Sequence, residues 1–246
     1  MPDFINGLAL SRAFFFEVVS PILKSVDPTL QYSAGLIGRG SEVLGFDTEM
    51  SMDHDWGPRV LIFHRLEDRE RCAKVSEALT VRLPSTFRGF PTSFTLPDPA
   101  DGGTQVMAES QAGLVNHRVE FDDISGFCEK ELGRNLTVDL PLLDWLAIPS
   151  QRLRSVVSGD VFRDDLDLDA LRNRCSWYPD DIWIYLMACT WQRLSQEEHL
   201  AGRAASVGDE IGWRIIVARI VRDIMRLTFL MSRGWLASVL SLPFAG

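Results

Sequence analysis

The chain's fold is decided by Gly38-Arg39-Gly40-Ser41 and, after a short gap, Ser51-Met52-Asp53-His54-Asp55-Trp56. The first stretch predicts a tight turn that leads into a helix, because glycines allow the turn and serine suits a helix start. The second stretch predicts a strand. Alternate side chains of a strand share a face, so we expect Asp53 and Asp55 to point to one side and His54 to the other.

The glycine turn has the features of a phosphate-binding loop. Backbone N–H groups at a helix start can approach a phosphate closely, Ser41 adds a hydroxyl, and Gly40 has no Cβ to obstruct a nucleotide. Arg39 and Arg59 are candidate contacts for a triphosphate, and the alternative is that each pairs with a carboxylate of the protein. The candidate phosphate-binding residues are therefore Gly38, Arg39, Gly40, Ser41 and Arg59.

The pair of acids predicts a divalent-metal site. Mg²⁺ prefers oxygen ligands, and nucleotidyl transfer normally needs several carboxylates to hold it. A third acid is expected on a later strand, and residues 116–122 alternate apolar and charged side chains. Glu120 and Asp122 on this charged face are both candidates, and Asp122 takes the place of Glu120 if the register is shifted. The alternative for Glu120 is exposure to solvent or an ion pair with Arg118.

Three segments carry a resemblance to a known family. They are residues 40–47 (Gly-Ser-Glu-Val-Leu-Gly-Phe-Asp), 53–59 (Asp-His-Asp-Trp-Gly-Pro-Arg) and 177–181 (Trp-Tyr-Pro-Asp-Asp). The chain resembles the nucleotidyltransferase superfamily of the polymerase-β-like fold, which includes the kanamycin and other aminoglycoside nucleotidyltransferases. More closely, it resembles an uncharacterised domain-of-unknown-function group within that superfamily. The resemblance implies that Asp53 and Asp55 are metal ligands, and Glu120 best matches the third acid.

Hydrophobic periodicity predicts an α+β fold. Helices are expected over residues 8–24, 67–83 and 180–202 and from 209 onward, with strands over 32–37, 55–63 and 116–122. The resemblance implies that residues 1–135 form a small mixed-sheet nucleotidyltransferase domain and that an all-helical domain follows in residues 136–246. The tryptophans of the second part are expected to fill its helical core: Trp177, Trp183, Trp191 and Trp213.

The expected function is Mg²⁺-dependent transfer of a nucleoside monophosphate, AMP from ATP or the equivalent from another NTP, onto a hydroxyl of a small molecule. Asp53, Asp55 and Glu120 form the catalytic and metal-binding set, and Glu120 completes the metal site or acts as the base. The alternative is a nucleotide-binding or partner-binding protein that keeps the fold without turnover. His54 between the two acids and the chain's stop at Gly246 favour that alternative.

Composition restricts the partners and the compartment. The formal net charge of −9 argues against extended nucleic acid, which normally needs a basic surface. The apolar runs are shorter than the roughly 20 residues of a membrane-spanning helix, so no membrane partner is expected. Four scattered cysteines predict reduced thiols in a cytoplasmic protein. The oligomeric state is left open by the sequence.

Overall fold

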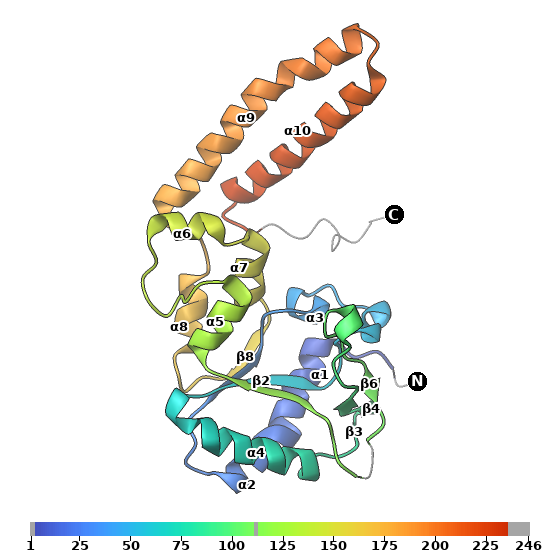
Figure 1. Ribbon diagram of the computed structural model, residues 1–246, viewed down its shortest axis with the longest axis vertical. Coiled ribbons are helices and arrows are strands. Elements are labelled where there is room, and N and C mark those ends of the chain that lie inside the picture. Colours follow the sequence, from blue (N-terminus) through green and yellow to red (C-terminus); the bar gives the residue numbers. More distant parts are fainter. Residues whose placement is uncertain (1–2, 111–112, 236–246) are drawn as a thin grey trace.

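The computed structural model describes residues 3–110 and 113–235 (Figure 1). Helices and strands are interspersed along the chain up to Arg174, and two long helices follow. The helices are α1 (Gly7–Phe14), α2 (Ser20–Val26), α3 (Ser41–Leu44), α4 (Arg69–Arg82), α5 (Ile124–Leu132), α6 (Leu142–Ala147), α7 (Ser150–Val157), α8 (Leu168–Arg174), α9 (Asp180–Ser206) and α10 (Glu210–Met231). The strands are β1 (Ser33–Leu36), β2 (Arg59–Phe63), β3 (Thr86–Phe87), β4 (Phe90–Pro91), β5 (Ser93–Phe94), β6 (Met107–Ala108), β7 (Arg118–Asp122) and β8 (Asp160–Arg163).

One mixed sheet carries the first part of the chain. Its strand order is β7-β2-β1-β8. Strand β1 is antiparallel to both of its neighbours, whereas β2 and β7 are parallel, with Arg59 opposite Arg118 and Leu61 opposite Glu120. Parallel neighbours need a long crossover, and α4 lies within the connection between them. This register brings the charged side chains of β7 beside the start of β2.

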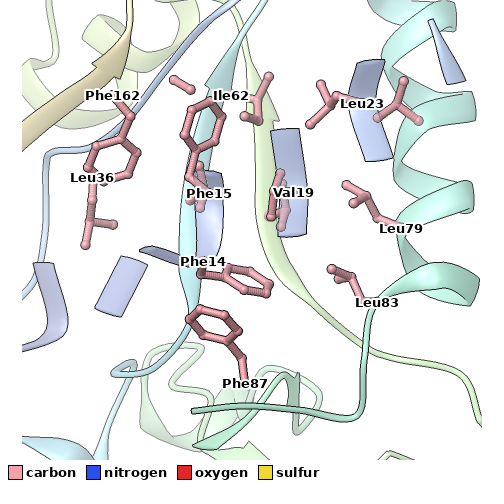
Figure 2. Packing of buried hydrophobic residues seen from close by; sticks show 14 of the residues in the cluster. Phe14, Phe15, Val19, Leu23, Leu36, Ile62, Leu79, Leu83, Phe87 and Phe162 are labelled. Atoms are coloured by element: carbon pink, nitrogen blue, oxygen red, sulfur yellow. The ribbon is translucent and has the colours of Figure 1, made fainter. Parts of the chain in front are cut away.

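Strand alternation divides the apolar side chains between two cores. Val60 and Ile62 of β2 belong to the core that α1 and α4 cover, which we call the α4 face. Figure 2 shows this core, where Phe14 and Phe87 approach to 5.4 Å between ring centroids. Leu61 and Phe63 point to the opposite side, called the α5 face, and pack with residues of α5, α7 and α8. The sheet is therefore buried on both sides over most of its area.

The α+β fold class predicted from periodicity is confirmed. Strand β1, the short helix α3 and the helices α4 and α10 form within the expected segments, while α9 begins as expected at Asp180 and runs four residues beyond the expected end at residue 202. The alternation of β7 is also as predicted, because Val119 is buried on the α4 face while Glu120 is exposed. The chain also returns to the sheet after residue 135, since β8 pairs with β1. The sequence reading missed that strand.

Helices α9 and α10 form a hairpin that projects away from the sheet (Figure 1). Arg193 of α9 and the buried Asp223 of α10 join the two helices through two hydrogen bonds of 2.5 and 2.9 Å. The expectation that the tryptophans fill a helical core is wrong for Trp191, whose exposed fraction is 55%. Trp213 is also exposed. Within the described residues, no helix has the length and apolar character needed to cross a membrane.

Candidate functional site

The turn before α3 is held by the elements of the α5 face. Gly38 has φ +89°, and its N–H donates a 2.9 Å hydrogen bond to the carbonyl of Ser155 in α7. Arg39 is largely exposed and lies 3.3 Å from Glu131 of α5, which also accepts a hydrogen bond from Arg152. The predicted glycine turn is therefore present, and its position is set by α5 and α7.

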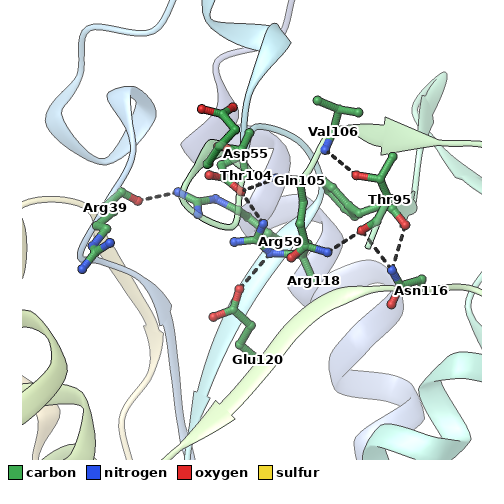
Figure 3. Close-up of polar contacts among 12 residues, drawn as sticks. Arg39, Asp55, Arg59, Thr95, Thr104, Gln105, Val106, Asn116, Arg118 and Glu120 are labelled. Carbon is green, nitrogen blue, oxygen red and sulfur yellow. Dashed lines mark hydrogen bonds and ion pairs between the residues drawn. The ribbon is translucent and has the colours of Figure 1, made fainter. Parts of the chain in front are cut away.

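A buried ion pair between Arg59 and Glu42 contacts the glycine turn. Arg59, the first residue of β2, donates from Nε to Glu42 at 2.8 Å, and its Nη2 atom is 2.5 Å from the same carboxylate oxygen. Nη2 also donates to the backbone oxygen of Arg39 at 2.6 Å (Figure 3). Gly40 has φ +137°, and an added Cβ would lie 2.4 Å from Arg59. The pair thus occupies the space that the missing Cβ leaves.

The segment with the paired acids is not a strand, which corrects the expected alternation of Asp53 and Asp55. Asp53 ends a 3-10 helix (Glu49–Asp53), and Asp55 has φ +48°, four residues before β2 begins. The Asp55 N–H donates to the carbonyl of Gln105 at 2.8 Å, and the buried Trp56 follows. Long-range packing therefore overrides the local extended pattern. The side chain of Asp53 lies outside the part that the structure describes.

Asp55 and Glu120 nevertheless meet at one cation. Arg118 of β7 donates to Asp55 Oδ1 at 2.5 Å and to Glu120 Oε1 at 2.8 Å (Figure 3). Burial lowers the pKa of Arg118, but the two carboxylates outweigh this effect and raise it. The ion pair with Glu120 was the alternative raised from the sequence. The sequence did not indicate that the guanidinium of Arg118 also binds Asp55.

Asp55 and Glu120 both present carboxylate oxygens to the guanidinium of Arg118. Oxygen ligands suit Mg²⁺, and acids from a loop and from a strand already surround one positive charge. Among the side chains that the structure describes, no three His, Cys, Asp or Glu residues gather in metal-binding positions. The metal-binding roles of Asp53, Asp55 and Glu120 stay predictions.

Three further residues near the site were not predicted as site residues, although Asp47 closes the segment 40–47 that carries the resemblance. Glu131 and Arg152 link α5, α7 and the glycine turn, although their own segments carry no motif. Asp47 joins the start of α1 to the buried Trp56. Its carboxylate accepts hydrogen bonds from the N–H of Gly7 at 2.6 Å and from the indole of Trp56 at 3.3 Å. Only the tertiary arrangement identifies these contacts.

The comparisons with known proteins place one domain in the chain. Residues 145–238 match the family described as Domain of unknown function (DUF4037). The matched segment contains α7, β8, α8, α9 and α10, but not Asp55 or Glu120. No curated protein and no solved structure matches the chain.

Proposed function

We propose that the protein is a Mg²⁺-dependent nucleotidyltransferase that moves AMP from ATP onto a hydroxyl of a small molecule. The observation that carries this proposal is the convergence of Asp55 and Glu120 on Arg118. Arg118 is the register partner of Arg59, and Arg59 contacts the backbone of the glycine turn. The candidate metal-binding acids and the candidate phosphate-binding turn are therefore linked through the neighbouring residues Arg118 and Arg59.

Each residue has a defined task in the proposed reaction. Asp55 and Glu120, together with Asp53, would hold the metal, which when bound neutralises the triphosphate and activates the attacking hydroxyl. Arg39, Gly40 and Ser41 would bind phosphate oxygens through backbone N–H groups and the serine hydroxyl, while the N–H of Gly38, which donates to Ser155, would hold the turn in place. Arg118 would be free to contact phosphate once its two carboxylates bind the ion. Arg59 would act by supporting the turn.

A second candidate is a nucleotide-binding protein without turnover. Two observations favour it: Arg118 already neutralises Asp55 and Glu120, and the Arg59–Glu42 pair fills the space beside Gly40. Both features stabilise the site without a metal. In this case ATP binding would persist while no pyrophosphate would be released.

Calorimetry with Mg²⁺ and ATP, followed by a pyrophosphate-release assay over a panel of small polyhydroxy acceptors, tests the proposal. Asp55→Asn and Glu120→Gln are expected to weaken Mg²⁺ binding and to abolish release. The matched control is Asp169→Asn, because Asp169 is an exposed carboxylate paired with Arg172 outside the site.

Arg118→Gln gives a sharper test of the metal site. Removing the competing cation from two carboxylates is expected to tighten Mg²⁺ binding by about tenfold, the effect of a charge-assisted hydrogen bond. Unchanged Mg²⁺ affinity in Arg118→Gln, Asp55→Asn and Glu120→Gln alike would refute the metal site. Tight ATP binding with no pyrophosphate release would instead support the second candidate.

A further inference from the structure

A cavity of about 200 Å³ lies where the base of the α9–α10 hairpin meets α6 and the start of α7. Its walls combine apolar side chains, among them Leu146, Ile148, Leu186 and Phe229, with polar groups. Drug-sized ligands occupy pockets of about 300–1,000 Å³, so this cavity suits a smaller molecule with roughly one ring. None of its lining residues belongs to the acid site or to the glycine turn.

Two indole N–H groups at the cavity lack acceptors. Trp177 and Trp235 both line it and pack together, with ring centroids 4.7 Å apart. The Nε1 atoms of both are shielded from solvent, and neither has a hydrogen-bond partner within the described ranges 3–110 and 113–235. Buried donors are normally satisfied, so this pair indicates a missing acceptor.

The remaining polar groups at the cavity favour a negatively charged ligand. Arg226 lines it, and among the residues that the structure describes no carboxylate does. Arg226 is exposed, and its positive charge lies close enough to Tyr178 to oppose the rise in the pKa of Tyr178 that burial causes. Pro149 and Ser150, at the N-terminal end of α7, complete this side, and none of the described side chains caps that end. A helix N-terminus and a guanidinium both attract anions.

We propose that this cavity binds a small organic anion. Its apolar ring would pack among the leucines and Phe229, and its acidic group, a carboxylate or a phosphate, would accept hydrogen bonds from Arg226 and the two indoles. Every lining residue lies within the segment 145–238 that matches DUF4037. The proposal does not depend on the transferase activity.

Helix α7 connects the cavity to the candidate active site. Ser150 lines the cavity, and the carbonyl of Ser155 accepts the hydrogen bond from Gly38. At 1.5 Å per residue these two positions are about 8 Å apart along the helix axis. A ligand in the cavity therefore binds one end of the helix that holds the glycine turn.

Titration of the ¹⁵N-labelled full chain tests the proposal. Phenylacetate and phenyl phosphate are the probes, because they share a ring and differ in the acidic group, and 2-phenylethanol is the neutral control. The spectrum contains one indole N–H signal for each of seven tryptophans. We expect the signals of Trp177 and Trp235, assigned with Trp177→Phe and Trp235→Phe, to shift with at least one anion and not with the alcohol.

A matched pair of arginine variants completes the experiment. Arg226→Gln is expected to weaken anion binding at least tenfold, whereas Arg214→Gln, at an exposed position of the same helix, leaves it unchanged. The proposal is overturned if neither anion shifts the two signals, if the alcohol binds as tightly as the anions, or if Arg226→Gln binds normally. Asp55→Asn keeps anion binding in the cavity, so failure of the transferase proposal is separately visible.

Discussion

Loss of the Glu42 carboxylate should cost this protein a large part of its stability. The Glu42 and Arg59 side chains are only 3% and 10% exposed, and the two contacts between them are 2.8 and 2.5 Å long. Glu42→Ala leaves the guanidinium buried with only the backbone oxygen of Arg39 as its described partner. Breaking a buried ion pair in this way costs about 3–5 kcal/mol. For a chain of this size that corresponds to a fall in Tm of roughly 10 °C.

Urea unfolding followed by circular dichroism measures the loss directly. The control is Glu210→Ala, because Glu210 pairs with Arg214 on an exposed helix surface, where the cost is below about 0.5 kcal/mol. The double variant Glu42→Leu with Arg59→Met should recover most of the stability, since it removes both buried charges. A loss for Glu42→Ala within about 1 kcal/mol of that for Glu210→Ala would refute the reasoning.

Three further outcomes are expected. Gly159→Ala should lower the free energy of unfolding in urea by several kcal/mol more than Gly133→Ala. Both glycines have positive φ. An added Cβ would lie 2.0 Å from the backbone oxygen of Leu36 in β1 at Gly159, whereas it would meet nothing within 4 Å at Gly133. Burial lowers the pKa of His117 in the folded protein. The free energy of unfolding should therefore decrease as pH drops below the unfolded pKa of about 6.5, because the unfolded chain then binds more protons. In His117→Asn the free energy of unfolding should depend less on pH between pH 7 and 5. Phe14→Ala, at a fully buried site, should lower the unfolding free energy by about 3–5 kcal/mol, and a loss below about 1 kcal/mol would contradict the packing in Figure 2.

Only part of the candidate site could be predicted from the sequence. The glycine turn and the charged face of β7 were both predicted from local pattern, and Arg118 was recognised as a neighbour of Glu120. The alternation rule failed at Asp55, because it applies only to extended backbone and Asp55 has φ +48°. The contact with Gln105, fifty residues away in sequence, holds that conformation.

The sequence by itself determined the fold class, the longest helices and the strands β1, β2 and β7, because apolar periodicity, glycine stops and helix caps act over a few residues. Only the tertiary structure decided that β8 joins the sheet, that Arg118 lies between two carboxylates, and that Trp177 meets Trp235 at a cavity. Each of these contacts joins segments whose pairing depends on how the two cores pack. No pattern within either segment specifies its distant partner.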